Sequence, residues 1–345
     1  MSQKMKSATI IITLGLLSVI LLSGCGVIGF DMGAENSSSN GGSRPAQNSQ
    51  SASNDQSAQS GQSTQQSSAA PAAIVELPEV YVPTASGTSV ESNGQAIVDF
   101  SNQQDGYIMA QFTEDTDLKI KVLITGPDGV QYKYTLMRNQ EFEVFPLSSG
   151  NGTYEIGVFK QVDGTRYSQE LSTTINVSLT DEFAPFLRPN QYVNFNQNSA
   201  VVRKAAELVA GKSDFMERVA AIYHFVITNI EYDVHLAETV QSEYLPDVDR
   251  ILESGKGICF DYAALMAAML RSQGIPTKLV IGYTGDVYHA WISVFSVEEG
   301  WLDDVIFFDG HEWRLVDPTF AASISSNELS QFIGDGANYT AKFMH

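Results

Sequence analysis

The sequence predicts an all-β sandwich followed by an α+β domain, both carried on a long polar N-terminal segment. Seven short runs rich in Val, Ile, Tyr and Phe alternate with turn sequences over residues 96–177, which is typical of a sandwich. Residues 201–230 place apolar residues at helical spacing, and strand-like runs begin at residue 277. The predicted segments are residues 1–24, 25–73, 74–180 and 181–345.

The first 24 residues have the pattern of an export signal. Lys4 and Lys6 precede an apolar run over residues 8–22, which is too short for a comfortable membrane span and ends in Leu22-Ser23-Gly24-Cys25. An uncleaved N-terminal anchor is the alternative, and either arrangement places the remaining chain outside the cytoplasmic membrane. The ending resembles the lipobox of bacterial lipoproteins. That resemblance implies that Cys25 is lipidated, becomes the mature N-terminus and anchors the chain to the bacterial cell membrane.

Residues 33–73 consist mainly of Ser, Gln, Asn, Gly and Ala, with almost no apolar side chains. Such a segment cannot bury enough apolar surface to fold, so residues 25–73 are expected to be a disordered tether. A flexible chain of roughly forty residues spans on the order of 35 Å. The tether would therefore hold the folded domains away from the membrane.

Residues 74–180 are expected to form the sandwich. The seven predicted strands are residues 96–100, 107–112, 118–125, 130–136, 141–145, 154–159 and 167–177. Turn sequences such as Gly126-Pro127-Asp128-Gly129 separate them. The run Gly152-Thr153-Tyr154-Glu155-Ile156 resembles the Gly-x-Tyr strand entry of bacterial immunoglobulin-like domains. The domain is expected to position the C-terminal domain as a spacer or to bind glycan or protein.

Residues 181–198 are expected to connect the two domains, because Pro185 and Pro189 interrupt regular structure. Two helices are predicted at residues 201–210 and 214–230, with Ser213 as a candidate N-cap of the second. These helices are expected to pack against a third, which begins at Cys259.

Cys259 comes directly after the glycine-rich stretch Gly255-Lys256-Gly257-Ile258, and Ala263, Met266 and Leu270 lie at helical offsets of four, seven and eleven from it. The thiol therefore lies at the start of a buried helix. The positive end of the helix dipole would lower the thiol's pKa and favour the nucleophilic thiolate. Backbone N–H groups there could also hold an oxyanion. The alternative is a structural role, since free cysteines often act as small apolar residues.

Two further residues complete a candidate triad. His289 opens an alternating stretch that extends to Val297, and Asp317 ends the strand-like run Trp313-Arg314-Leu315-Val316. Cysteine, histidine and aspartate supply a thiolate nucleophile, a general base and acid, and a carboxylate that orients the imidazole. Each of them lies at the end or start of a predicted element.

Four separate blocks resemble the transglutaminase-like superfamily, which is related to papain-like thiol enzymes. They are Gly257-Ile258-Cys259-Phe260-Asp261-Tyr262-Ala263, Gly274-Ile275-Pro276 through Gly282-Tyr283, His289-Ala290-Trp291, and Val316-Asp317-Pro318-Thr319-Phe320. The resemblance covers roughly residues 185–345 and implies a papain-like α+β fold with Cys259, His289 and Asp317 as catalytic residues. Residues 299–310 exceed the short turn of many bacterial members, so an added hairpin or extended loop is expected there.

The composition limits which partners and cofactors are expected. The formal net charge is −20, and the sequence has no cluster of lysine and arginine that would bind phosphates, so nucleic acid is not expected as a partner. At long range this charge favours cationic or amine-bearing molecules. Cys25 and Cys259 are the only cysteines and leave no pair for a disulfide once Cys25 is acylated. We expect no cofactor and no metal, because His224, His235, His311 and His345 match no ligand spacing.

Two functional hypotheses remain. In the first, the chain is an anchored thiol enzyme that cleaves or transfers acyl groups at amide bonds of proteins or peptides in the cell envelope. The acyl group passes from Cys259 to water or to a primary amine, and the resemblance to bacterial members favours hydrolysis. In the second, the fold is kept as a binding or scaffold lipoprotein without chemistry. The oligomeric state is left open.

Overall fold

The computed structural model describes residues 77–303 apart from residues 139 and 286, the short strands at 11–13, 306–308 and 313–315, and residues 339–345. Strand β1 (Ile11–Thr13) pairs antiparallel with β9 of the N-terminal half. The predicted lipidation site Cys25 and the tether lie outside the described residues, as does the triad candidate Asp317. Within the described part of the chain, no helix is long and apolar enough to cross a membrane.

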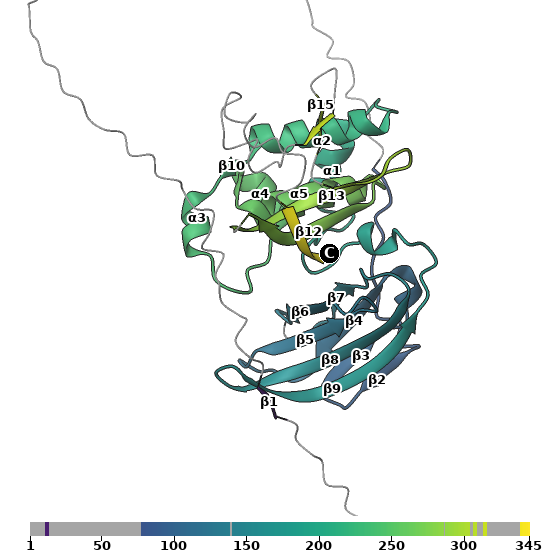
Figure 1. Cartoon of the computed structure of the whole chain (residues 1–345), viewed down its shortest axis with the longest axis vertical. Helices are drawn as coiled ribbons and strands as arrows, with labels where there is room; N and C mark the ends of the chain where they lie inside the picture. The colour runs from purple at the N-terminus through teal and green to yellow at the C-terminus, as the bar shows by residue number, and fades with distance from the viewer. Residues whose placement is uncertain are drawn as a thin grey trace, which may run out of the picture. The chain divides into compact units, whose positions relative to one another are not determined.

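The N-terminal half contains two antiparallel sheets (Figure 1). The first has the order β2-β3-β4-β7 and comprises β2 (Val90–Ser92), β3 (Ala96–Asp99), β4 (Tyr107–Phe112) and β7 (Glu143–Pro146). The second has the order β1-β9-β8-β5-β6 and contains β5 (Ile120–Thr125), β6 (Gln131–Thr135), β8 (Gly152–Asp163) and β9 (Arg166–Val177). A short 3-10 helix, η1 (Gln103–Asp105), precedes β4.

The two sheets share one apolar core. Buried side chains of β3 and β4, such as Val98 and Ile108, belong to the same cluster as Val122, Ile156 and Ile175 of the second sheet. Alternate residues of strands in two facing sheets bury one another in this way. Each of the seven predicted runs overlaps a strand. The sequence did not indicate β2, because all three of its residues are exposed and lack the apolar alternation of a half-buried strand.

The C-terminal half combines helices with a four-stranded antiparallel sheet of order β14-β13-β12-β17. The helices are α1 (Ala200–Val209), α2 (Phe215–Asn229), α3 (Val234–Thr239), α4 (Val248–Ser254) and α5 (Cys259–Ser272), with the 3-10 helix η2 (Ala184–Phe186) in the connector. The strands are β12 (Thr277–Thr284), β13 (Val287–Ser296), β14 (Gly300–Asp303) and β17 (Tyr339–Met344). Short pairs are formed by β10 (Glu231–Tyr232) with β11 (Lys256–Gly257), and by β15 (Ile306–Phe308) with β16 (Trp313–Leu315).

Two expectations about local structure are tested directly. Residues 299–310, where an added hairpin or extended loop is expected, contain two strands: β14 pairs with β13, and β15 pairs with β16. The expected N-cap Ser213 is wrong by one residue. The Asp214 carboxylate accepts a hydrogen bond from the Glu217 N–H at 2.9 Å, so Asp214 caps α2. The carboxylate also suits the positive end of the helix dipole.

Helix α5 is the centre of the C-terminal half. Every residue from Cys259 to Ser272 is buried, and α5 contacts α1, α2 and α4 as well as β12 and β13 (Figure 1). A helix that is apolar on all sides belongs in a core. Four of its residues are alanines, which let neighbouring backbones approach closely. The position of Cys259 is therefore fixed by packing on every side of α5.

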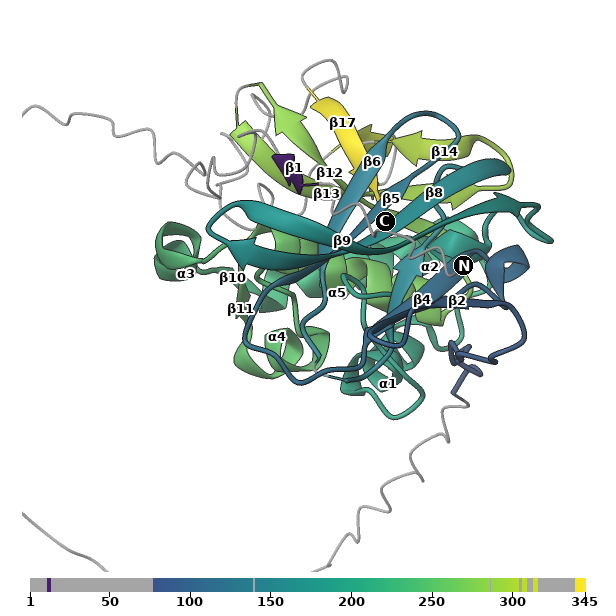
Figure 2. The same ribbon diagram turned by 90° about the horizontal axis from the view of Figure 1, so that it is seen from below.

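The far end of α5 is tied to β17 and to the sandwich. The Arg271 guanidinium donates hydrogen bonds to the carbonyls of Thr277, Arg188 and His345 at 2.9, 2.9 and 2.5 Å. His345 Nδ1 lies 3.0 Å from the Tyr134 hydroxyl of β6, and Figures 1 and 2 both draw this end of the chain near β6. Burial lowers the pKa of Arg271 to about 9, so the guanidinium stays protonated at neutral pH. These contacts join the two halves through buried polar groups.

His345 makes stability depend on pH. Burial, together with the nearby Arg271 cation, lowers the pKa of His345 from 6.5 to about 3. Well above pH 6.5 the imidazole is neutral in both the folded and the unfolded state. As the pH falls below 6.5, only the unfolded chain takes up the proton, so the native state loses stability. We expect a loss of about 2 kcal/mol between pH 6.5 and pH 5 from this group.

Urea unfolding of the wild type and His345→Gln at several pH values in this range measures the effect. The variant should lose that part of the pH dependence, whatever its stability at pH 7.5. Parallel pH profiles for the two proteins would show that His345 is not buried in its neutral form.

Candidate active site

Cys259 is the first residue of α5, directly after strand β11 and the cap residue Ile258. Its side chain is 4% exposed and lines a cavity between the two halves. The first turn of a helix leaves backbone N–H groups without intrahelical partners, and these groups lie around the residue that opens it. The predicted position of the thiol at a helix start is confirmed.

Asp261 holds this helix start in place. Its Oδ2 accepts a hydrogen bond from the Ile258 N–H at 2.9 Å, and its Oδ1 accepts one from the Tyr244 hydroxyl at 2.7 Å. Burial raises the pKa of the Asp261 carboxyl, while these two hydrogen bonds act in the opposite direction. A Cβ on Gly257 would lie 2.6 Å from the Asp261 Cβ, so only glycine fits before Ile258. The Gly-Ile-Cys-Phe-Asp sequence is therefore one structural unit.

Further contacts extend from this unit. Arg250 donates a hydrogen bond to the Tyr244 hydroxyl oxygen at 2.7 Å, which connects α4 to the helix start. The Tyr262 hydroxyl donates to the Ile230 carbonyl at 2.6 Å and fixes α5 to the end of α2. Sequence analysis did not identify Tyr244, which lies 17 residues before Asp261, because no local pattern connects the two.

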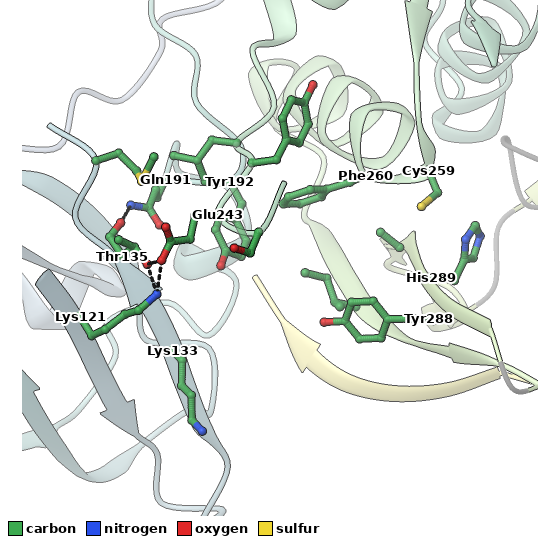
Figure 3. Close-up of a pocket in the computed structure, with 16 residues that line it drawn as sticks. Lys121, Lys133, Thr135, Gln191, Tyr192, Glu243, Cys259, Phe260, Tyr288 and His289 are labelled. Atoms are coloured by element: carbon green, nitrogen blue, oxygen red, sulfur yellow. Dashed lines mark hydrogen bonds and ion pairs between the residues drawn. The ribbon is translucent and has the colours of Figure 1, made fainter. Parts of the chain in front are cut away.

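His289 approaches the thiol from the sheet. It lies on β13 opposite Gly282 of β12 and is 2% exposed. Its ring lies nearly parallel to that of Trp291 on the same face of the strand, with centroids 6.3 Å apart, and Tyr339 of β17 packs edge-on against Trp291. Figure 3 shows Cys259 and His289 at the same end of the cavity, which both residues line. Packing thus brings together two of the three predicted catalytic residues.

The third predicted residue, Asp317, lies outside the described residues. Strand β16 ends at Leu315, two positions before it, so the strand-like run that was expected to precede Asp317 contains a strand. The carboxylate partner of His289 stays a prediction from the sequence.

A family model described as the transglutaminase-like superfamily matches residues 202–318. Residues 202–318 are a transglutaminase-like domain. The match begins later and ends earlier than the range of roughly 185–345 expected from the sequence blocks. It includes Cys259, His289 and the fourth block as far as Pro318, and it ends before β17.

Two relatives match about a third of this chain or less. Kyphoscoliosis peptidase of Mus musculus is 31% identical over 117 residues, which are 34% of this chain and 17% of that protein. A protein-glutamine gamma-glutamyltransferase of Pseudomonas aeruginosa is 29% identical over 109 residues, covering 27% of this chain and 14% of that protein. The chain thus spans less than a fifth of the length of these relatives.

Among solved structures, red sea bream transglutaminase is 14% identical and gives a TM-score of 0.27, with 62% of this chain and 48% of that chain covered. A TM-score of 0.27 does not indicate a shared fold, and the transglutaminase-like domain is shown by the family model.

Gly282 shows how closely the sheet of the transglutaminase-like domain is packed beside His289. A Cβ on Gly282 would lie 2.8 Å from the Trp291 ring and would also collide with the Thr340 carbonyl oxygen of β17. The missing side chain lets β17 and Trp291 close over β12. Because Gly282 pairs with His289 across the two strands, this packing restrains the position of His289 on β13.

Substitution of Gly282 tests this packing. Because a methyl group has no space there, Gly282→Ala should destabilise the protein by about 2 kcal/mol or more. The control is Gly285→Ala, where nothing lies within 4 Å of the new Cβ and only the positive φ of 57° opposes alanine. That conformation costs about 1 kcal/mol. Urea midpoints of the two variants compare them, and an equal or smaller loss for Gly282→Ala would contradict the close contact.

The cavity beside Cys259 and His289 has a volume of about 350 Å³. The transglutaminase-like domain contributes an aromatic wall that includes Phe260 and Tyr288, and the sandwich contributes residues of β5 and β6. Burial raises the pKa of Tyr288 to about 12, with smaller contributions from Tyr283 and Cys259, so its hydroxyl stays protonated at neutral pH. The cavity can accept a few side chains of a peptide, since ligand sites of this kind begin at roughly 300 Å³.

Glu243 connects this cavity to the sandwich. One carboxylate oxygen lies 2.7 Å from the Lys119 Nζ, and the other lies 2.5 Å from the Lys121 Nζ and 3.1 Å from the Thr135 hydroxyl. Burial alone would raise the pKa of Glu243, but the hydrogen bonds from Lys119 and Lys121 outweigh it and lower the pKa. The backbone of Glu243 has φ of +76°, a conformation that costs a non-glycine residue about 1–2 kcal/mol. The ion pairs help to stabilise this strained loop.

Removal of the charge alone tests the Glu243 contacts. Glu243→Gln keeps the shape of the side chain and should lower the stability by about 1 kcal/mol, because the carboxylate is mostly buried and has two cationic partners. Glu207→Gln is the control, since Glu207 pairs with Lys204 on an exposed helix surface and should change stability by less than about 0.5 kcal/mol. Unfolding at low and high salt distinguishes them, and equal effects of the two substitutions would contradict the proposed stabilisation of the loop.

Proposed function

We propose that the chain is a thiol enzyme that cleaves or transfers acyl groups at amide bonds of proteins or peptides. The observation that carries this proposal is the buried thiol of Cys259 at the start of α5, which lines the same end of the cavity as the His289 imidazole (Figure 3). The transglutaminase-like family model supports it, since the match includes both residues.

The proposed reaction begins when the Cys259 thiolate attacks the carbonyl carbon of an amide. A C–S bond forms, and the carbonyl electrons move to the oxygen, which the N–H groups in the first turn of α5 stabilise. His289 carries the thiol proton to the leaving amine, and the C–N bond breaks to leave a thioester. Asp317 would orient the imidazole. Water then releases a carboxylic acid, or a primary amine forms a new amide, and the thiol is restored.

Hydrolysis is the outcome that we propose as the main one, with transfer to an amine as the alternative. The printed names of the relatives include both a peptidase and a gamma-glutamyltransferase, so the family alone does not separate them. The preference for hydrolysis depends on the four sequence blocks, which resemble those of bacterial members of the transglutaminase-like superfamily.

We propose further that the protein is held at the outer face of the cell membrane by a lipid on Cys25, with residues 25–73 as the tether. The pattern of residues 1–25 supports this localisation. For the sandwich we propose an immunoglobulin-like domain. Its support is the strand order, because β4 pairs with β7 while the intervening β5 and β6 belong to the other sheet. Such Greek-key connections are typical of immunoglobulin-like sandwiches.

Alkylation of Cys259 tests the proposed chemistry. The soluble chain from residue 74 onward should react with iodoacetamide at pH 7 about ten times faster than the same chain in denaturant, because the helix start and His289 favour the thiolate. His289→Ala should remove most of this difference, and Asp317→Ala should reduce it. His224→Ala, an exposed histidine of α2, is the control and should have no effect. A thiol that reacts no faster when folded would favour the scaffold hypothesis.

The fate of the acyl group can be measured in the same proteins. Incubation of casein with the enzyme and a fluorescent primary amine should yield new peptides if water is the acceptor, and labelled casein if the amine is. Cys259→Ala should abolish either product. Product formation that survives this substitution would assign the activity to a contaminant.

A further inference from the structure

The sandwich contributes a basic wall to the candidate active site. Along β6 the side chains of Tyr132 and Tyr134 are buried, whereas Lys133 is exposed and Thr135 half-buried on the other face of the strand. Thr135 pairs with Lys121 of β5, and all three residues Lys121, Lys133 and Thr135 line the cavity that also contains Cys259. The outer face of β5 and β6 is thus part of the cavity.

The charge of this wall differs from that of the whole chain. Among the described residues that line the cavity, those with a lysine, arginine, aspartate or glutamate side chain are Lys121, Lys133 and Glu243. Lys121 is bound to Glu243 and to the Thr135 hydroxyl. Within the described part of the chain, Lys133 forms no ion pair. A chain of net charge −20 therefore presents an available cation at its candidate active site.

The wall and the thiol lie at opposite sides of one cavity. In Figure 3, Lys121 and Lys133 extend from the sandwich strands, Cys259 and His289 lie on the other side, and Phe260 and Tyr288 lie between them. Tyr192 packs edge-on against Phe260, with ring centroids 5.2 Å apart. A peptide whose amide bond reached the thiol would cross this aromatic surface before it met Lys133.

We propose that Lys133 binds a carboxylate of the substrate, so that the enzyme prefers acidic peptides with the acidic residue remote from the reacting amide. The inference depends on the proposed function for the identity of the other end of the cavity. Glu243 forms ion pairs with Lys119 and Lys121, so Lys133 is the lysine of the cavity that determines specificity. The sandwich is then part of the substrate-binding site and not only a spacer.

The test measures equilibrium binding to the Cys259→Ala chain. The probes are fluorescein-labelled hexapeptide libraries with Glu fixed at one position at a time, each matched to a library with Gln at that position. Fluorescence anisotropy should show about threefold tighter binding of the Glu library for at least one position, as expected for an exposed ion pair. The preference should shrink as NaCl is raised.

Two variants in the same background assign the effect. Lys133→Met keeps the apolar stem of the side chain and should abolish the preference for Glu. Lys204→Met removes an exposed lysine of α1 outside the cavity and should leave it unchanged. Equal binding of the Glu and Gln libraries at every position, or a preference that persists in Lys133→Met, overturns the inference.

The two proposals fail in different ways. An inert thiol in the alkylation experiment would overturn the proposed chemistry, while a Glu preference that depends on Lys133 would still stand. Rapid alkylation with no Glu preference would leave the chemistry in place and remove Lys133 from substrate recognition.

Discussion

The structure depends most on the hydrogen bonds that fix the start of α5. The Asp261 carboxylate accepts from the Ile258 N–H and the Tyr244 hydroxyl, and Gly257 leaves the space that the carboxylate side chain needs. Because α5 is buried along its whole length, these contacts determine where Cys259 lies relative to the sheet and to the loop that carries Tyr244. Removal of either partner would leave a buried polar group without its hydrogen bond, which is costly.

The candidate site is completed by elements far apart in the sequence. His289 is held by Trp291 and by the approach of β17 over Gly282, and Glu243 bonds to Lys119 and Lys121, which precede it by 124 and 122 residues. Arg271 and His345 connect the opposite end of α5 to β6. The cavity therefore depends on both halves of the chain, and Lys121 and Lys133 of the sandwich form part of its lining.

Much of this could be predicted from the sequence. Alternating apolar residues indicated the seven strand runs, and apolar residues at helical spacing indicated the helices at 201–210 and 214–230. The blocks around Cys259 and His289 indicated the candidate site and the transglutaminase-like domain. The exposed strand β2 gives no alternating pattern. Ser213 and Asp214 are both suitable N-cap residues, and the residue at which α2 begins decides which of them caps it. The contacts of Glu243 and the burial of His345 arise only from the packing of distant segments, which no local pattern records.

The central claim is that the start of α5 makes Cys259 a nucleophile towards carbonyl carbon. The most direct measurement is peptide mass spectrometry after brief exposure to p-nitrophenyl acetate. The thiolate would displace p-nitrophenolate and leave an acetyl group on the sulfur. The account predicts that Cys259 is acetylated before any lysine, through a thioester that neutral hydroxylamine removes. Acetylation confined to lysines, with Cys259 unmodified, would contradict it.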